Sequence, residues 1–189
     1  MVSNIAVFAS GGGSNFENLA LKSAESGFDI KVLIADSPDV FAVKRAEKLN
    51  IPSIIVDRSA DADKQKFETG IREALSDFDI EYIVLAGFMR ILSAEFINAY
   101  KDRIINLHPS LLPSFKGKNG IEDAYNYGVK VTGVTVHYVD AGIDTGKIIA
   151  QTAVIIEEDD TLLSLEDKIH QTEYELYPEA LKKVLDGRV

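Results

Sequence analysis

The sequence NLHPSLLP occupies residues 106–113 and directly follows the apolar pair Ile104 and Ile105. Side chains alternate between the two faces of an extended chain, so Asn106 and His108 point one way and Leu107 points the other. Pro109 has no backbone donor and ends the predicted strand. The pattern therefore places an amide and an imidazole at the carboxyl end of a strand, where open α/β sheets bind their ligands.

A lone histidine after a strand is more often a structural residue than a catalyst. Histidine nevertheless serves often in acid–base chemistry, because its ordinary pKa of about 6.5 lies near physiological pH. The neighbouring amide of Asn106 and the rigid turn bounded by prolines favour a catalytic His108.

Length and composition indicate one globular domain over residues 1–189. A chain of 189 residues with 46% apolar residues can bury a substantial core, and domains run to roughly 250 residues before they split. No apolar run approaches the ~20 residues that a membrane span requires. No basic segment precedes the short apolar run at residues 5–9, so we expect no signal peptide there.

Charge and cysteine content exclude several classes of function. The formal net charge of −10 makes the chain a poor nucleic-acid binder, because phosphate neutralisation supplies most of that affinity. The absence of cysteine excludes disulfides, thiol catalysis and Cys-based metal sites, and it fits a cytoplasmic location. The three histidines lack the spacing of metal ligands, so we expect no metal. The expected partners are small-molecule substrates, and the expected assembly is a monomer or weak homodimer.

Hydrophobic periodicity predicts alternating strands and helices in the first half of the chain. Strands are expected at residues 3–9, 30–35, 51–56 and 82–86, and helices after residue 14 and at residues 41–49 and 61–75. Ser93 is expected to cap a further helix before the strand that ends at His108. This order, with short connections, predicts a doubly wound α/β fold with a mostly parallel sheet.

A different pattern follows Pro113. A helix is expected at residues 121–127 and extended strands at residues 132–139 and 147–156. The segment between these strands is too short for a crossover helix, so we expect an antiparallel pair. A long C-terminal helix is expected to begin after the cap Thr161 and to kink or break at Pro178. Its expected apolar stripe consists of Leu162, Leu165, Ile169 and Leu176.

The sequence SGGGSN occupies residues 10–15, directly after the first predicted strand. Glycines let a backbone approach a ligand closely, and Ser14 or Asn15 can cap the helix that follows. A strand, a glycine loop and a helix N-terminus together form an anion site. We favour phosphate binding over a plain tight turn. The loop lacks the third spaced glycine of a dinucleotide fingerprint and the Gly-Lys-Ser/Thr of a nucleoside-triphosphate loop.

Other residues have both a structural and a ligand-binding interpretation. Lys64 lies in the first turn of a predicted helix, where a helix gains little from a cation, and such a lysine is usually only solvated. Residues 88–92 either pack in the core or form a wall for a flat, partly apolar ligand. His137 lies within a predicted strand and is interpreted as structural. His170 and Glu173 share a helix face that is interpreted as solvated.

The loop at residues 140–146 carries Asp144 in an Asp-Thr-Gly tripeptide. An acidic residue in a glycine loop is more often part of the turn. An aspartic protease needs two carboxylates that share a proton, so one tripeptide is weak evidence for that class. Strand ends on one side of a sheet gather at one edge, so Asp144 can approach His108. There it would raise the pKa of His108, whose cation could donate to an oxygen that gains charge in a transition state.

Together these stretches resemble the folate-dependent formyltransferases, and among them the phosphoribosylglycinamide formyltransferases of purine synthesis. The resemblance covers nearly the whole chain and rests on residues 10–15, 85–92, 106–113 and 140–146. Folate formyltransferases and deformylases share the run at residues 106–113. Methionyl-tRNA formyltransferase carries an additional C-terminal domain and formyltetrahydrofolate deformylase an additional N-terminal domain, and we expect neither here.

The resemblance implies that the formyl group of the co-substrate 10-formyltetrahydrofolate passes directly to the amine of phosphoribosylglycinamide. The implied catalytic residues are Asn106, His108 and Asp144. The implied phosphoribosylglycinamide-binding residues are Gly11, Gly12, Gly13, Ser14, Asn15 and Glu173, with the backbone around His170. The implied folate-binding residues are Lys64, Met89, Arg90, Ile91, Leu92, Asn106, Val139, Asp140 and Asp144.

Two positions depart from the family pattern, and two other functions stay open. Lys64 stands where some relatives have arginine, which keeps a cation but loses bidentate geometry. Lys116 precedes Gly117 where proline is more common, which bears on the shape of the loop at residues 114–120 and not on the chemistry. A 10-formyltetrahydrofolate hydrolase would use the same three catalytic residues with water in place of the amine. A nucleotide-binding module without catalysis would have no activity to lose.

Overall fold

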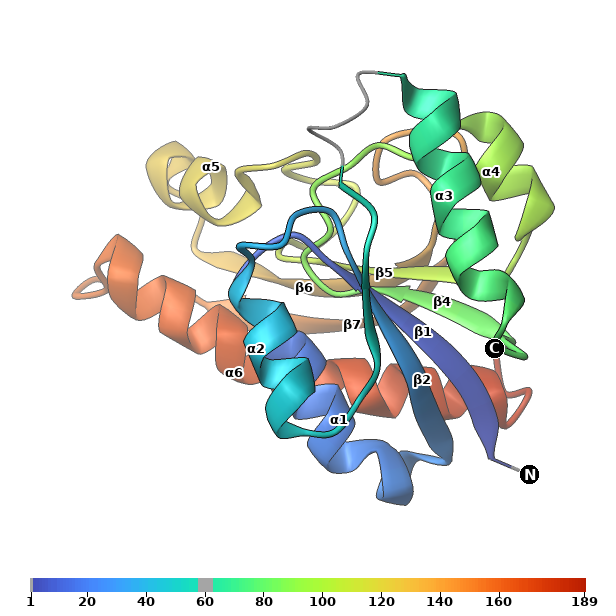
Figure 1. Ribbon diagram of the computed structural model, residues 1–189. Helices are drawn as coiled ribbons and strands as arrows, with labels where there is room; N and C mark the ends of the chain where they lie inside the picture. The colour runs from blue at the N-terminus through green and yellow to red at the C-terminus, as the bar shows by residue number, and fades with distance from the viewer. Residues whose placement is uncertain (1, 58–62) are drawn as a thin grey trace. The chain divides into compact units, whose positions relative to one another are not determined.

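The computed structural model describes residues 2–57 and 63–189, which form two compact units, Met1–Ile105 and Asn106–Val189 (Figure 1). The first unit contains β1 (Ser3–Ala9), α1 (Ser14–Ser26), β2 (Phe28–Ala35), α2 (Phe41–Lys48), β3 (Ser53–Ile55), α3 (Lys64–Ser76), β4 (Tyr82–Leu85), α4 (Ala94–Ala99) and the start of β5 (Ile104–His108). The second unit contains the end of β5, α5 (Gly120–Tyr127), β6 (Val131–Tyr138), β7 (Ile148–Ile155) and α6 (Leu162–Leu185).

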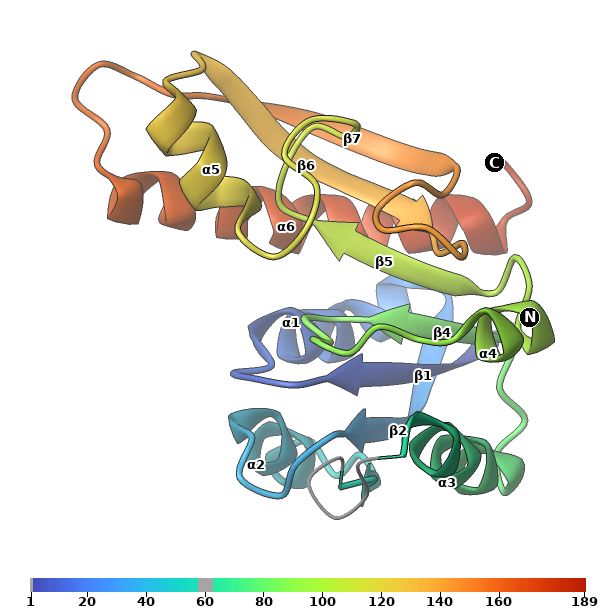
Figure 2. The same cartoon turned by 90° about the horizontal axis from the view of Figure 1, so that it is seen from above.

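The strands of the first unit form a parallel sheet in the order β3-β2-β1-β4. The N–H of Ile83 in β4 donates to the carbonyl oxygen of Arg103, directly before β5. Helices α1 and α2 lie on one face of this sheet and α3 and α4 on the other, as Figures 1 and 2 show. This is the doubly wound arrangement that the alternation of strands and helices predicts.

The core of the first unit explains which segments became strands and helices. Residues 5–9 of β1 are all buried, as expected of a central parallel strand with helices on both faces. Phe16 and Leu19 of α1 and Ile71 of α3 supply buried apolar side chains from the two layers. Ser93 caps α4 as predicted, because its hydroxyl accepts from the N–H of Phe96 at 3.0 Å.

Several boundaries in the first unit differ from the sequence prediction; strand β2, for example, begins at Phe28 instead of residue 30. Strand β3 covers Ser53–Ile55 instead of residues 51–56, since Pro52 has no N–H to donate to a ladder. Helix α3 begins at Lys64, capped by Asp63, whose carboxylate accepts from the N–H of Gln65 at 2.9 Å. The predicted start at Asp61 lies outside the described residues.

The second unit is built on an antiparallel hairpin, as predicted. Strands β6 and β7 pair from Val131 with Ile155 to His137 with Ile148. Helix α6 lies along both strands and α5 packs against α6 (Figure 2). Thr161 caps α6 in a reciprocal capping box with Ser164. The buried residues Leu165, Ile169 and Leu176 form the predicted apolar stripe, whereas Leu162 is only half-buried.

Helix α6 does not break at Pro178. It continues to Leu185, and Pro178 itself is buried within it. Of the two predicted effects the break is therefore wrong, and the kink stays a prediction. In the described part of the chain, no helix combines the length and the apolar character that crossing a bilayer would need.

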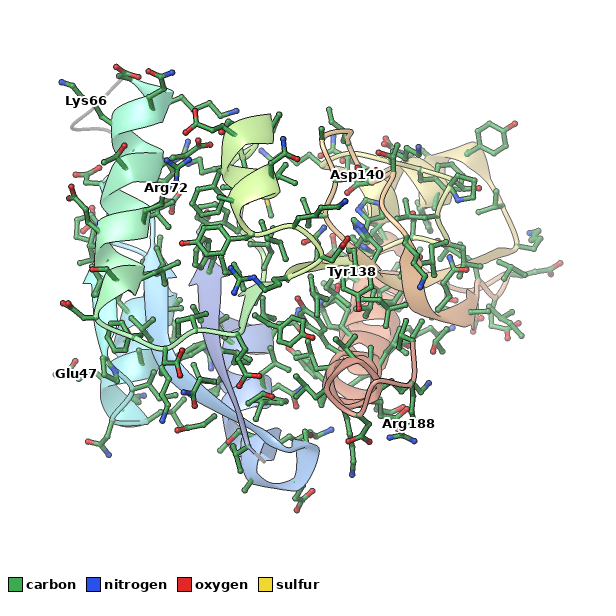
Figure 3. The ribbon with its side chains drawn as sticks, turned by 90° about the vertical axis from the view of Figure 1, so that its right-hand side faces the viewer. Glu47, Lys66, Arg72, Tyr138, Asp140 and Arg188 are labelled. Atoms are coloured by element: carbon green, nitrogen blue, oxygen red, sulfur yellow. The ribbon has the colours of Figure 1, made fainter. Side chains whose placement is uncertain are left out.

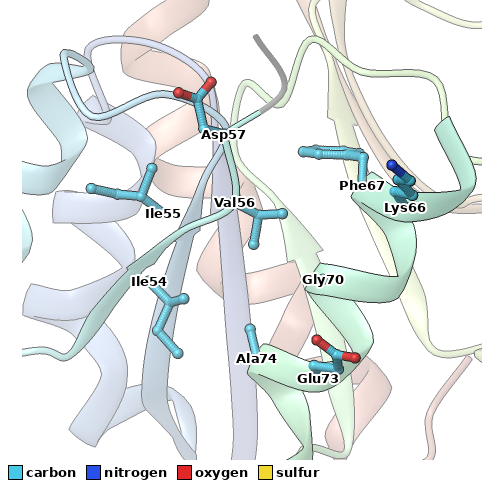
Figure 4. Close-up of a pocket in the computed structure, with 9 residues that line it drawn as sticks. All are labelled: Ile54, Ile55, Val56, Asp57, Lys66, Phe67, Gly70, Glu73 and Ala74. Atoms are coloured by element: carbon cyan, nitrogen blue, oxygen red, sulfur yellow. The ribbon is translucent and has the colours of Figure 1, made fainter. Parts of the chain in front are cut away.

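A cavity of about 500 Å³ lies in the first unit between residues 54–57 and helix α3 (Figure 4). Val56, Phe67 and Ala74 give it apolar walls, and Lys66 and Glu73 lie on its α3 side. None of the residues predicted for catalysis or binding lines this cavity.

Candidate active site

Strand β5 ends at His108, directly before Pro109, as the sequence predicts. Leu107 and His108 are buried and Asn106 is half-buried. The strand therefore holds the amide of Asn106 and the imidazole of His108 in the second unit, where burial limits the movement of both side chains. Asn106 meets His137 of the β6–β7 hairpin, and His108 meets both Phe115 of the loop after β5 and Asp144 of the hairpin loop.

Both ring nitrogens of His108 face oxygen atoms. Nε2 lies 2.8 Å from the carbonyl oxygen of Phe115, and Nδ1 lies 3.5 Å from Oδ2 of Asp144. Gly120 leaves room for the ring, because a Cβ at that position would come within 3.3 Å of Nε2. A doubly protonated imidazolium would therefore have an acceptor for each N–H.

Asp144 links the hairpin loop to the loop after β5. Its Oδ2 accepts from the N–H of Gly117 at 2.8 Å, and its Oδ1 lies 3.7 Å from Nε2 of His137. Its backbone takes a left-handed conformation with φ of 50°, which aspartate tolerates better than most residues. The structure thus brings Asp144 to His108 as expected, while its catalytic role stays a prediction.

His137 lies beside the predicted catalytic residues Asn106 and Asp144, although its position within a strand predicted only a structural role. Its Nδ1 lies 2.8 Å from the carbonyl oxygen of Tyr138, and its Nε2 lies 3.3 Å from Nδ2 of Asn106. Burial is the main cause that lowers the pKa of His137. One signal was available in the sequence, because Thr135 and His137 alternate with Val134 and Val136 and so share the polar face of the strand.

A buried hydrogen-bond network fixes the loop that carries Phe115. The hydroxyl of Thr135 donates to the carbonyl oxygen of Ser110 at 2.6 Å and accepts from the N–H of Leu112 at 3.1 Å. Gln151 of β7 donates to Thr135 at 2.9 Å and to the carbonyl oxygen of Leu112 at 3.0 Å. Because Thr135 is fully buried, this network holds residues 110–112 firmly on the hairpin.

The remaining hairpin residues predicted to bind folate lie at the end of β6. Val139 is half-buried and Asp140, labelled in Figure 3, is exposed. The carboxylate of Asp140 accepts from the N–H of Gly142 at 3.0 Å and from the hydroxyl of Thr145 at 2.6 Å. Asp140 therefore shapes the loop that carries Asp144.

Glu173 is buried in α6, so the interpretation of a solvated face is wrong for this residue. It is only 5% exposed, and its Oε2 lies 2.9 Å from Nδ1 of His170. This hydrogen bond raises the pKa of His170, against the opposing effect of partial burial. Burial, with a smaller contribution from the charge of Glu173, raises the pKa of Tyr177.

The glycine loop of the first unit leads directly into α1. Gly13 precedes the helix in a left-handed conformation with φ of 71°, and no side chain caps the helix. The predicted cap at Ser14 or Asn15 is therefore wrong, because both residues already belong to the first turn. Gly11 and Gly12 are exposed, and a Cβ on either would meet no atom within 4 Å.

The segment at residues 87–92 is tied to this loop within the first unit. The N–H of Ser10 donates to the carbonyl oxygen of Gly87 at 3.1 Å, and the N–H of Met89 donates to the Ser10 hydroxyl at 2.9 Å. Arg90 pairs with the buried Asp36 at 2.5 Å.

Some side chains of residues 88–92 pack in the core and others face outward, so the segment shows features of both predicted alternatives, core packing and a wall for a ligand. Phe88 and Leu92 are buried in the core, whereas Met89 is 60% exposed and Ile91 is 72% exposed. The segment therefore anchors itself with two apolar side chains and presents two others outward.

Lys64 lies at the start of α3, one helical turn before Glu68. Glu68 is buried and accepts from the N–H of Ser93 at 2.6 Å, directly after the segment that ends at Leu92. Side chains four apart on a helix share a face, so Lys64 lies on the face of α3 that holds this segment. Within the described residues, no three His, Cys, Asp or Glu side chains are placed to hold a metal ion.

Comparison of the chain with models of known protein families identifies the family to which it belongs. A family model described as formyl transferase matches residues 3–181. The chain belongs to the formyl transferase family.

The names of the similar proteins place the relatives of this formyl transferase in purine biosynthesis. It is 45% identical to phosphoribosylglycinamide formyltransferase of Bacillus subtilis (strain 168), over 95% of this chain and 93% of that protein. It is 40% identical to the trifunctional purine biosynthetic protein adenosine-3 of Chironomus tentans over 98% of this chain, which spans only 14% of that protein. The crystal structure of phosphoribosylglycinamide formyltransferase from Bacillus halodurans superposes with a TM-score of 0.93 at 43% identity, covering 97% of this chain and 95% of that chain.

These findings confirm the resemblance and the fold class predicted from the sequence. The protein is an enzyme of formyl transfer that acts on small molecules. The individual roles of the site residues stay predictions.

Proposed function

We propose that this formyl transferase passes the formyl group of 10-formyltetrahydrofolate to the amine of phosphoribosylglycinamide, in purine biosynthesis in the cytoplasm. The observation that carries the proposal is the grouping of Asn106, His108, His137 and Asp144 in one unit, in a chain 45% identical to a phosphoribosylglycinamide formyltransferase. We propose further that residues 1–189 act as a single domain, without a metal ion, as a monomer or weak homodimer.

The reaction needs no covalent bond to the enzyme. The unprotonated amine attacks the formyl carbon, a C–N bond forms, and the carbonyl electrons move onto the formyl oxygen. The tetrahedral intermediate then expels the folate nitrogen, which takes up the proton that the amine loses. The products are the formylated ribonucleotide and tetrahydrofolate.

The task of the enzyme is to stabilise the oxyanion of that intermediate. The amide N–H of Asn106 and an N–H of protonated His108 are the proposed donors. Asp144, 3.5 Å from Nδ1 of His108, would balance the imidazolium charge. Because the Phe115 carbonyl already accepts at Nε2, donation from Nε2 requires that carbonyl to move aside when substrates bind.

Residues of the first unit are proposed to bind the two substrates, and three residues of the second unit have proposed binding roles as well. The open glycines at residues 11 and 12 allow a phosphate to approach the backbone. The outward side chains of Met89 and Ile91 offer apolar surface for the folate ring. Lys64, Arg90, Leu92, Val139, Asp140 and Glu173 keep the roles that the resemblance implies.

The deciding experiment follows the absorbance of a 10-formyl folate analogue with and without phosphoribosylglycinamide. Loss of the formyl group only with the ribonucleotide is the expected result. Equal loss without it would mean a hydrolase, and no loss in either case would contradict formyl transfer. His108→Ala and Asn106→Ala should each lower kcat by about 10²–10³-fold, whereas the exposed Asn98→Ala on α4 should not.

A further inference from the structure

The glycine loop at residues 11–13 is supported from outside by helix α2. The carbonyl oxygen of Gly11 accepts from the N–H of Ala42 at 3.1 Å, and the carbonyl oxygen of Gly12 accepts from Nε of Arg45 at 2.8 Å. Gly13 packs so closely on α2 that a Cβ would come within 2.6 Å of the Ala42 Cβ. Two successive carbonyl groups of the loop are thus fixed by one helical turn.

Fixing a carbonyl group also aims the N–H that follows it. A trans peptide is planar, and its C=O and N–H point in opposite directions. The Gly11 carbonyl therefore turns the N–H of Gly12 away from α2, and the Gly12 carbonyl turns the N–H of Gly13 away from Arg45. Among the residues that the structure describes, the N–H groups of Gly12, Gly13 and Ser14 have no protein acceptor.

Arg45 is itself held by several groups in the first unit. Beyond the Gly12 carbonyl, its guanidinium pairs with Glu17 in the first turn of α1. It also lies 5.1 Å from the centre of the Phe41 ring. Its charge is balanced by Glu17, and its planar group is oriented on three sides.

We propose that Arg45, ordered by Glu17, is a positioning residue that aims the N–H of Gly13 at the phosphate of the ribonucleotide substrate. The inference rests on the proposed function, which assigns this loop to the phosphate. A lysine cannot replace Arg45, because an ammonium group cannot bridge the Gly12 carbonyl and Glu17 with fixed planar geometry.

Kinetics separate this role from a general loss of structure. Arg45→Ala should raise KM for phosphoribosylglycinamide about 10-fold or more, as expected when a hydrogen bond to a charged group is lost. KM for the folate co-substrate should not change. Arg45→Lys should give the same pattern, and it serves as the test if Arg45→Ala fails to fold. Lys44→Ala is the matched control, because Lys44 is an exposed cation of the same helix, 5.8 Å from the same Phe41 ring.

Glu17→Gln distinguishes positioning from direct attraction of the phosphate. If Arg45 positions the loop, weakening its partner should raise KM for phosphoribosylglycinamide. If Arg45 acts only through its positive charge, removing the neighbouring negative charge of Glu17 should lower the KM for phosphoribosylglycinamide. In that case Arg45→Lys should keep the wild-type KM. A lowered KM in Glu17→Gln, or an unchanged KM in both Arg45 variants, would overturn the proposal.

A binding measurement makes the test independent of turnover. Amide resonances of Gly12 and Gly13 should shift saturably when inorganic phosphate is added to the wild-type protein, and the apparent affinity should fall about 10-fold in Arg45→Lys. Wild-type resonances that do not respond would overturn this inference, whatever reaction the enzyme performs. A wild-type response without formyl transfer would instead contradict the proposed function alone.

Discussion

At the scale of single residues, His137 connects the backbone of β6 to the predicted catalytic side chains. The contact of Nδ1 with the Tyr138 carbonyl places the proton on Nδ1, so Nε2 is left to accept from the amide of Asn106. Burial lowers the pKa of His137, which favours the neutral ring that this arrangement needs. The Asn106 amide is thereby held in one orientation, with its second N–H available to a substrate oxygen.

We predict that His137→Leu lowers kcat about 10-fold. This loss is smaller than the roughly 10²–10³ expected for a direct donor, because the Asn106 amide stays in place but loses its fixed orientation. Steady-state kinetics beside Asn106→Ala would test the order of the two effects. A His137→Leu enzyme with the wild-type kcat, in a protein of unchanged melting temperature, would show that His137 is only structural.

His170 predicts a pH dependence of stability. Its folded pKa is raised by the hydrogen bond with Glu173 above the ordinary 6.5, so the stabilisation is fully present below that value and is lost as pH rises through the folded pKa. The difference in unfolding free energy between wild type and His170→Gln should therefore be larger at about pH 5.5 than at about pH 9. Urea titrations at both pH values measure it, and an equal difference at both would contradict the prediction.

At the scale of elements, strand β6 offers a matched pair of buried threonines. Thr135 bonds to Ser110, Leu112 and Gln151. Thr132 is 1% exposed, and in the described residues its hydroxyl has no hydrogen-bond partner. The same isosteric change to valine therefore removes a hydroxyl with three hydrogen-bond partners at Thr135 and an unpaired hydroxyl at Thr132.

We predict that Thr135→Val lowers the free energy of unfolding by about 2 kcal/mol or more, because each buried polar group left unpaired costs roughly 1–3 kcal/mol. Thr132→Val should stay within about 0.5 kcal/mol of the wild type or increase stability. Denaturant unfolding of both variants provides the comparison. Equal losses would mean that the network contributes nothing beyond packing.

At the scale of the whole molecule, the open question is whether the two compact units unfold together. Strand β5 belongs to both, since Ile104 and Ile105 lie in the first unit and the rest of the strand lies in the second. We predict one cooperative transition, because separating the units would break this strand. The test compares far-UV circular dichroism with tyrosine fluorescence, since the chain has no tryptophan and five of its seven tyrosines lie in the second unit. Transitions with different midpoints would contradict a single domain.

The parts of this protein that the sequence predicts correctly depend on neighbours along the chain. The order of strands and helices follows from side-chain periodicity. The caps Ser93 and Thr161 each act on the N–H three residues further on, and Pro109 ends β5 by itself. The stretches at residues 10–15, 85–92, 106–113 and 140–146 carry the resemblance to the formyl transferase family, and each of them is contiguous in the sequence.

The tertiary structure decided the features that join distant residues. The sequence suggested that Asp144 approaches His108, but only the fold shows that their side chains lie 3.5 Å apart. The fold also places His137 beside Asn106 and Asp144, whereas its position on β6 was compatible with a purely structural role. Gly13 precedes α1 in place of a capping side chain and packs against α2, and Glu173 is buried although its position on the helix favoured a solvated face. Periodicity determines which face of an element is apolar, whereas the neighbours that meet a polar side chain depend on how separate elements pack together.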